Sequence, residues 1–223
     1  LSVSKIKNKY LKYGKEEVLS VSGEFGIVNQ IEHLGRSYAG VSVHNYGVVE
    51  LNQIVYTKSP LKENPYGIIK LNKHKAGIVS TLYAVYTLNK NTDGQFIEYY
   101  FSLDAHLNRY LRPLVRKGAK NDMKISNEYV LNDCVFAPQL AEQKRIANFF
   151  SIVDQKLNQL KEKLNDLRQY KKGVMQQIFS QDLRFKDCNG KDFTDWEEFS
   201  LEELVEFRNG KAHEKKISKD GKY

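Results

Sequence analysis

The chain has 223 residues, of which 41% are hydrophobic and 12% aromatic, a composition that supports one ordinary domain with an extension and excludes a disordered tail. No apolar run reaches membrane-spanning length, so we expect a protein of the cytoplasm without membrane contact. Cys134 and Cys188 are far apart and lack metal-ligand neighbours, which argues against a zinc site and against a disulfide framework.

The formal net charge is +8 and the sequence pI is about 9.2. The basic excess lies in residues 1–180, whereas residues 181–223 are mildly acidic. A basic surface of this kind favours a polyanion as partner. A charge that serves only solubility is the alternative.

Residues 1–137 are expected to form a sheet-rich domain of the α+β class. They contain runs of β-branched and aromatic residues of strand length, separated by Gly and Pro turn signals. The predicted strands are 16–23, 40–51, 53–60, 66–72 and 77–88.

An amphipathic helix is predicted over residues 95–114, near the end of this domain. Seven apolar residues would share one face of it. They are Phe96, Tyr99, Tyr100, Leu103, Leu107, Tyr110 and Leu114.

A much longer helix is predicted from near Leu140 to near Phe179, after a break at Pro138. At about 1.5 Å per residue it would be roughly 60 Å long. Apolar residues recur along it at alternating steps of four and three, the a/d pattern of a coiled coil, with Lys171 as the one exception. The predicted helix-pairing residues are Ile146, Phe150, Val153, Leu157, Leu160, Leu164, Leu167, Val174 and Ile178.

This narrow stripe requires one long partner helix, and the helix at 95–114 is about half the necessary length. We therefore expect the partner in a second copy, in another protein, or in another part of a longer polypeptide. Folding of the long helix back onto its own domain is the alternative.

Residues 181–223 begin as a connector. Ser200 and Glu203 then have the spacing of a capping box, which predicts a short helix ending at Asn209–Gly210.

The sequence offers no persuasive catalytic constellation. The tetrapeptide "NPYG" at 64–67 lacks the second Pro of an amino-methyltransferase motif, and we interpret it as a turn. Phosphate-loop, zinc-protease and nucleophile-elbow patterns are absent from the sequence. We therefore expect no catalytic residue, no metal site and no cofactor bound by this chain.

Two segments mix basic, polar and aromatic side chains, "VYTKSPLKENPYGIIK" and "RYLRPLVRKGAKNDMK". Arg and Lys pair with guanine edges, Asn with adenine, and Lys and Tyr with phosphate oxygens. A solvated, basic helix C-terminus is the alternative for the second segment. The predicted DNA-contacting residues are Lys58, Lys62, Asn64, Tyr66, Arg112, Arg116, Lys117, Lys120 and Asn121.

The stretch "PQLAEQKRIANFFSIVDQKLNQLKEKLNDLRQYKKGVMQQIFSQDLRFKD" resembles the conserved helical region of the specificity (S) subunit of Type I restriction-modification enzymes. Parts of residues 18–125 also resemble one type of target recognition domain of that family. The matching motif residues are Pro138, Leu140, Glu142, Gln143, Ile146, Ala147, Phe149, Phe150, Ser151, Asp154, Lys171, Lys172, Gly173, Met175, Gln176, Gln177 and Phe179.

The resemblance implies a non-catalytic subunit that reads half of a bipartite sequence in double-stranded DNA. It implies a target recognition domain (1–137), a conserved spacer helix (138–180) that pairs antiparallel with a second long helix, and a connector with the start of a second recognition-like segment (181–223). The second helix would belong to the other half of a full-length subunit or to a second copy.

The partners implied are methyltransferase (M) and restriction (R) subunits, which would use S-adenosylmethionine, ATP and Mg²⁺. Residues 195–211 supply the opening typical of such a domain, which residues 1–20 lack. The chain is therefore expected to be an interior segment or a permuted half-subunit. A helical scaffold that binds protein and does not read DNA is the alternative function.

Overall fold

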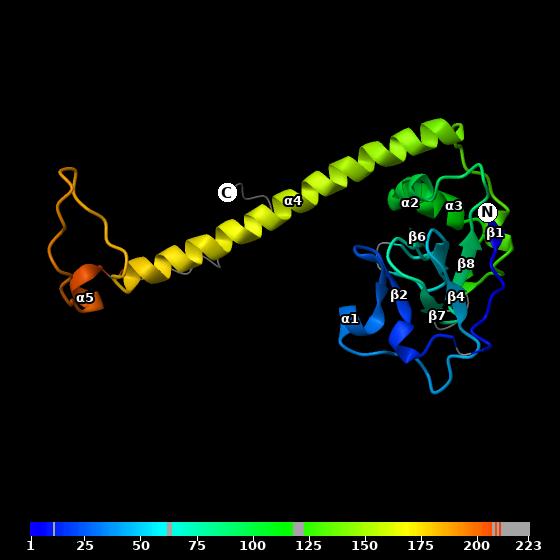
Figure 1. Cartoon of the computed structure of the whole chain (residues 1–223), viewed down its shortest axis with the longest axis horizontal. Coiled ribbons are helices and arrows are strands. Elements are labelled where there is room, and N and C mark those ends of the chain that lie inside the picture. The colour runs from blue at the N-terminus through cyan, green and yellow to red at the C-terminus, as the bar shows by residue number, and fades with distance from the viewer. Residues whose placement is uncertain (11, 62–63, 118–122, 207, 209, 211–223) are drawn as a thin grey trace. The chain divides into compact units, whose positions relative to one another are not determined.

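The computed structural model describes residues 1–10, 12–61, 64–117, 123–206, 208 and 210 (Figure 1). The chain divides into two compact units, Leu1–Lys161 and Glu162–Tyr223, and the division falls inside the long helix α4 (Leu140–Phe179). The observed class is mixed α and β, with sheets and one long helix, as predicted. The predicted boundaries at 137/138 and 180/181 stay predictions.

The first unit is built on an antiparallel sheet in the order β1-β8-β5-β6. In the centre, Ile54 of β5 faces Leu71 of β6 on one side and Tyr86 of β8 on the other. All four residues of β5 are buried, because both faces of the sheet are covered, and this explains the continuous apolar run in the sequence. The strands are β1 (Ser2–Val3), β5 (Ile54–Thr57), β6 (Ile69–Leu71) and β8 (Tyr83–Thr87).

Helices α2 (Gly94–Ser102) and α3 (Asp104–Leu111) cover one face of this sheet, and two of the smaller strand pairs, β2 with β3 and β4 with β7, lie on the other (Figure 1). Tyr56 and Tyr86 point into the core cluster beneath the helices. Val55 and Val85, which alternate with them, point into the opposite cluster. Alternation along each strand thus supplies two separate cores.

The described residues of the first unit also form three two-stranded sheets and three short helical segments. The antiparallel pairs are β2 (Leu19–Ser22) with β3 (Gly26–Asn29), β4 (Gly47–Val49) with β7 (Gly77–Val79), and β9 (Arg116–Lys117) with β10 (Met123–Lys124). The helical segments are η1 (Lys15–Glu17), α1 (Gln30–Leu34) and η3 (Tyr129–Leu131).

Each predicted strand region contains at least one observed strand, and region 77–88 contains two, β7 and β8. The elements that were not predicted include β1, β3, α1, β9 and β10, together with the short helical segments η1 and η3. They are short, and β3 leads directly into α1, whose N-cap Asn29 is also the last residue of the strand. Because the last strand residue is also the N-cap of the helix, no loop separates the two elements and the sequence shows no turn signal there.

The single helix predicted over 95–114 is wrong, because the chain breaks at Leu103. Leu103 has an extended backbone (φ −81°, ψ 111°), and Asp104 opens α3. A carboxylate at this position interacts favourably with the positive end of the new helix. As a result Leu103 is exposed and does not lie on the buried face, whereas Leu107, Tyr110 and Leu114 are buried as predicted.

Helix α4 has the predicted bounds, Leu140–Phe179. In the second unit, the short helix α5 (Leu201–Leu204) begins at the predicted capping box: the Glu203 carboxylate accepts hydrogen bonds from the backbone N–H and the hydroxyl of Ser200. These bonds lower the pKa of Glu203. The predicted end at Asn209–Gly210 is wrong, because Val205 is already extended.

Among the described residues, no helix combines the length and the apolar character that crossing a membrane requires.

Candidate nucleic-acid interface and helix-pairing surface

The two segments predicted to contact DNA, 55–70 and 109–124, meet at the end of β5. The Tyr56 hydroxyl donates a hydrogen bond of 2.8 Å to the carbonyl oxygen of Tyr66 in the first segment. The same hydroxyl oxygen lies 4.0 Å from the sulfur of Met123 in the second. Two stretches that are distant in the sequence therefore share one region of the first unit, called here the candidate interface.

A second link across the candidate interface joins Lys58 to Asn127. The Lys58 ammonium donates to the side-chain oxygen of Asn127 at 3.1 Å, and the Tyr86 hydroxyl donates to the Asn127 carbonyl oxygen at 3.0 Å. Asn127 was missed by the sequence reasoning, although an Asn amide beside a Lys in a basic segment is a typical base-reading group. The link fixes where the Lys58 charge lies.

Three buried tyrosines pack in the core beneath the candidate interface and donate hydrogen bonds to its loops. Tyr56 and Tyr86 are almost fully buried, and the Tyr110 hydroxyl donates to the Val130 carbonyl oxygen at 2.7 Å. Burial raises the pKa of all three phenols, that of Tyr110 to about 12. The hydroxyls are therefore neutral donors at physiological pH, suited to holding loops in place.

The turn before β6 approaches β5 very closely. The backbone N–H groups of Leu61 and Gly67 both donate to the Asn64 carbonyl oxygen at 3.0 Å. Gly67 has φ +89°, and a Cβ there would collide with the carbonyl oxygen of Thr57. Only glycine fits this position, so the predicted turn at 64–67 is observed and is tied to the end of β5.

The individual DNA-contacting residues remain predictions. Arg112 and Arg116 are exposed, whereas Asn64 and Tyr66 are half-buried. The Asn64 side-chain oxygen is buried and has no hydrogen-bond partner within the described part of the chain. Lys62, Lys120, Asn121 and the side chain of Lys117 lie outside the described residues.

Helix α4 is attached to the first unit near its N-terminus, chiefly through Gln143, which is 4% exposed. The Gln143 amide nitrogen donates to the carbonyl oxygens of Pro138 (2.8 Å) and Asn91 (3.3 Å), and its amide oxygen accepts from the Asp93 backbone N–H (2.9 Å). One turn on, Ala147 is also buried. The amide thus fastens the helix to the loop before α2.

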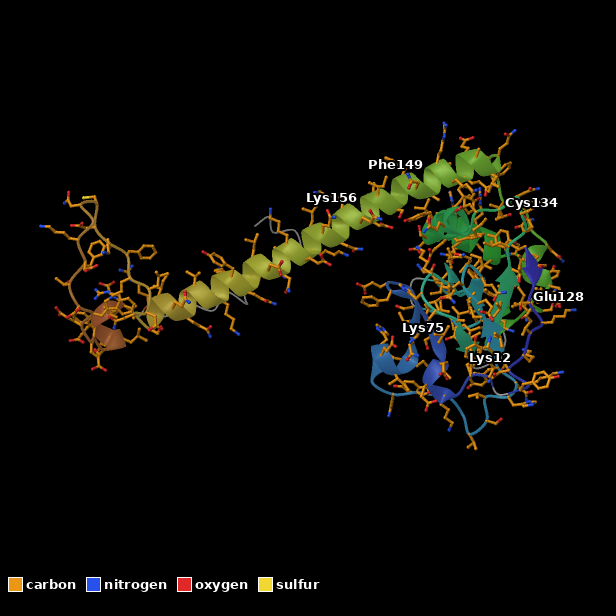
Figure 2. The ribbon with its side chains drawn as sticks, viewed as in Figure 1. Lys12, Lys75, Glu128, Cys134, Phe149 and Lys156 are labelled. Carbon is orange, nitrogen blue, oxygen red and sulfur yellow. The ribbon has the colours of Figure 1, made fainter. Side chains whose placement is uncertain are left out.

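Farther along α4, an aromatic contact and one hydrogen bond to α2 complete the attachment. The Tyr99 hydroxyl donates to the Asp154 carboxylate at 2.7 Å, and the Tyr99 and Phe150 rings are 5.3 Å apart. Figure 2 marks Phe149 and Lys156 on α4, whose side chains stand out along the helix. From residue 155 to residue 172 every residue of α4 is exposed.

The predicted helix-pairing stripe is exposed over most of its length. Leu157, Leu160, Leu164 and Leu167 are each about half exposed, whereas Ile146, Val174 and Ile178 are intermediate. Burial of the exposed half of each such leucine against a partner would stabilise the pair by roughly 1 kcal/mol per side chain, about half the value for a fully exposed leucine. Pairing with a second helix stays a prediction.

An apolar hollow lies between α2, α3 and the first turns of α4. Phe96, Tyr100, Leu103 and His106 form one side, and Ile146 and Phe150 of the stripe form the other. The Tyr100 and His106 rings are 4.6 Å apart. The exposed stripe is therefore continuous with apolar surface on the first unit.

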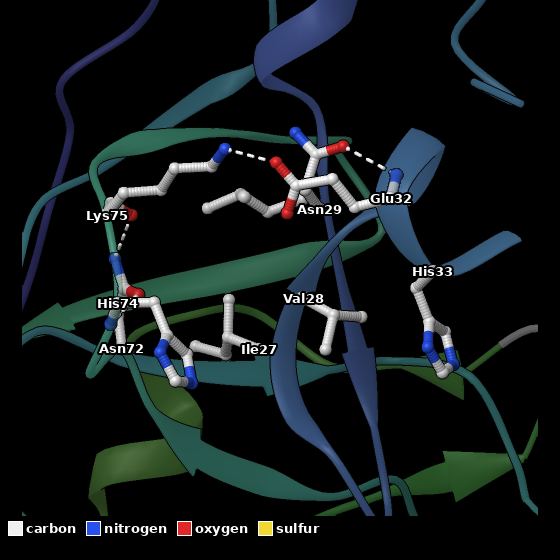
Figure 3. Close-up of a pocket in the computed structure, with 9 residues that line it drawn as sticks. Ile27, Val28, Asn29, Glu32, His33, Asn72, His74 and Lys75 are labelled. Atoms are coloured by element: carbon white, nitrogen blue, oxygen red, sulfur yellow. Dashed lines mark hydrogen bonds and ion pairs between the residues drawn. The ribbon is translucent and has the colours of Figure 1, made fainter. Parts of the chain in front are cut away.

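A separate hollow lies between β3, α1 and the loop at 72–75 (Figure 3). The Lys75 ammonium and the Glu32 carboxylate form an ion pair of 2.7 Å beside it. Asn29 caps α1 by accepting from two backbone N–H groups, and the Asn72 amide donates to two carbonyl oxygens. The Asn29 and Asn72 side chains thus hold the backbone around this hollow in place.

No protein-family model matches the sequence. In the part of the chain that the structure describes, no group of three or more His, Cys, Asp or Glu side chains is placed to hold a metal ion.

Proposed function

We propose that this chain is a DNA sequence-recognition subunit, or a segment of one, of a Type I restriction-modification system, which reads half of a bipartite target and docks methyltransferase subunits. The observation that carries the proposal is the meeting of segments 55–70 and 109–124 in one candidate interface. The motif resemblance of α4 supports it independently.

In the proposed mechanism the chain performs no chemistry. Exposed Arg112 and Arg116 would contact phosphates and set the register of the domain on the duplex. Amide groups such as that of Asn127 would read base edges. The methyltransferase partner would supply S-adenosylmethionine chemistry on an adenine flipped out of the stack.

The experiment is DNA binding of the double variant Arg112→Ala, Arg116→Ala across a salt series. Each lost phosphate contact reduces the slope of log affinity against log salt by about 0.9. We expect weaker binding to every duplex and a slope smaller by roughly two.

The matched control is the double variant Lys90→Ala, Lys144→Ala. Both residues are exposed, and both are adjacent in sequence to residues joined by the hydrogen bond from Gln143 to Asn91. This loop follows Thr87, at the end of β8 away from Thr57 and the candidate interface. If the arginine variant shows the same slope of log affinity against log salt as the wild type, Arg112 and Arg116 do not contact the DNA.

Sequence readout needs a second measurement, methylated-base mapping in cells that express the chain with its flanks and a cognate methyltransferase subunit. A split motif of methylated adenines supports the proposal. An assembled complex that gives no sequence-dependent methylation would favour the alternative, a helical scaffold that binds protein and does not read DNA. Such a scaffold would also expose an apolar stripe like that of α4.

A further inference from the structure

The side chain of Asn127 has a fixed orientation at the candidate interface. Its Oδ1 atom accepts a hydrogen bond of 3.1 Å from the Lys58 ammonium. An ammonium group donates and never accepts, so the oxygen of the amide, and not its nitrogen, must face Lys58. The Nδ2 group therefore points away from Lys58, on the other branch of the amide.

The backbone around Asn127 is held as firmly as its side chain. The Asn127 carbonyl oxygen accepts a hydrogen bond of 3.0 Å from the hydroxyl of Tyr86, which is almost fully buried in β8. The neighbouring Ser126 Oγ accepts from the Tyr129 backbone N–H at 3.1 Å, which closes the turn before η3. The amide is thus presented by a residue whose position is set before any ligand binds, a condition for precise readout.

The Asn127 amide nitrogen is open to a ligand. Within the described part of the chain its Nδ2 group donates no hydrogen bond, and it is not one of the buried polar atoms that lack a partner. The side chain as a whole is half-buried. Its two amide hydrogens therefore face solvent beside the positive charge of Lys58.

This arrangement changes which base an asparagine reads. An asparagine with both amide atoms available pairs with adenine, because its oxygen accepts from N6 while its nitrogen donates to N7. At Asn127 the oxygen is occupied by Lys58, so the amide presents donors to the DNA.

In the major groove guanine displays two acceptors, O6 and N7, whereas adenine and cytosine each display an amino donor. Thymine has one acceptor beside a methyl group. A donor amide with a lysine charge next to it is therefore complementary to guanine.

We propose that Asn127 reads a guanine in the major groove of the half-site, and that Lys58 is the positioning residue that makes the amide a donor. The inference rests on the proposed function, and it names one base and the residue that selects it.

The test is methylated-base mapping in cells that express the chain, with its flanks, and a cognate methyltransferase subunit, for the wild type and for Asn127→Asp. The aspartate retains an oxygen for Lys58 and replaces the amide donor by an acceptor. We expect one guanine of the half-site to be replaced by cytosine, whose amino group donates, and methylation of the original target to fall at least about tenfold.

Asn132→Asp is the matched control. It adds the same negative charge five residues away, at an exposed position. We expect its methylated motif to be the same as that of the wild type, so any general effect of the charge on DNA binding is measured separately.

Lys58→Met tests the positioning role without altering Asn127. The Asn127 oxygen then loses its donor, and the amide can turn to pair with adenine. We expect the same position of the motif to accept guanine and adenine, with the preference for guanine reduced at least about tenfold. A lysine that serves only the stability of the loop would instead lower methylation of all targets equally.

Three results would overturn the inference: an unchanged motif in Asn127→Asp, an adenine in the wild-type motif at the position that the variants alter, or a Lys58→Met variant with the wild-type preference. Each of these leaves the proposed function in place, because the wild-type complex still methylates a defined target. Methylation without any sequence dependence in the wild type would remove the proposed function itself.

Discussion

Gly67 is the residue that permits the close approach of the 61–67 turn to β5. Its φ of +89° and the nearness of the Thr57 carbonyl oxygen leave no room for a side chain. A substitution here combines backbone strain with a steric clash, each of which typically costs about 1–3 kcal/mol.

We expect Gly67→Ala to lower the free energy of unfolding by at least about 2 kcal/mol, measured by urea denaturation. The control is Gly40→Ala, where a Cβ meets nothing within 4 Å. The control should stay within about 0.5 kcal/mol of the wild type. Equal stability of the two variants would show that the turn relaxes around the new methyl group.

Tyr110 gives a prediction for alkaline pH. Burial raises its pKa to about 12 in the folded protein, above the ordinary value of 10, so folding favours the neutral phenol. The stabilisation is complete below pH 10 and is lost as the pH rises towards 12. Below pH 10, Tyr110→Phe should be less stable by about 1 kcal/mol, because it lacks the hydrogen bond to Val130.

The stability difference between wild type and Tyr110→Phe should therefore shrink above pH 10 and change sign near pH 11, because each pH unit between the two pKa values removes about 1.4 kcal/mol. Tyr56 and Tyr86 are present in both proteins, so they cancel in the comparison. Urea unfolding curves of both proteins at pH 8, 10, 11 and 12 measure this difference in the free energy of unfolding. A difference that does not vary with pH would contradict the raised pKa of Tyr110.

At the scale of elements, α4 depends on Gln143 for its attachment. The amide makes three hydrogen bonds to backbone groups, two in the loop before α2 and one at Pro138, just before α4 begins. Gln143→Ala would leave these buried backbone groups without hydrogen-bond partners, and each unpaired group typically costs about 1–3 kcal/mol of stability.

We expect hydrogen exchange in Gln143→Ala to increase over residues 140–154 and over the loop at 91–93, with little change in β5 and β8. Gln159→Ala, exposed on the same helix, is the control and should leave exchange over 140–154 unchanged. Faster exchange throughout the sheet would instead assign Gln143 to the stability of the whole unit.

The sequence predicted the elements with strong periodicity or composition signals and missed those set by short-range geometry. Helix α4 begins and ends at the predicted residues because its heptads are uninterrupted and Pro138 precedes it. The break at Leu103 was missed, because the apolar spacing continues through it while the backbone does not.

The candidate interface was predicted as two segments, and only the fold could show that they meet. Their link depends on hydrogen bonds of Tyr56 and Asn127 to residues distant in the sequence, and no local pattern predicts such pairs. Lys62, Lys120 and Asn121 lie outside the described residues, so their roles stay predictions.

At the scale of the molecule, the helix pairing that belongs to the proposed function would set the separation of the two proposed DNA-reading domains. Deletion of one heptad, residues 157–163, retains the phase of the stripe and shortens this separation by about 10 Å.

We expect the heptad deletion to shorten the spacer of the methylated target by roughly three base pairs and to leave the half-site bases unchanged. Methylated-base mapping measures both. A four-residue deletion is the comparison, because it shifts the stripe out of phase and should abolish the helix pairing. Altered half-site bases in the heptad deletion would contradict a spacer role for α4.

The attachment of α4 through Gln143 has a consequence for how this protein changes over generations. The amide bonds to backbone groups, the carbonyl oxygens of Pro138 and Asn91 and the N–H of Asp93; every amino acid presents such a carbonyl oxygen, and every one except proline presents the N–H. Most side chains of the first unit can therefore change without loss of these bonds, whereas Tyr99, whose hydroxyl donates to Asp154 of α4, is constrained by its own contact.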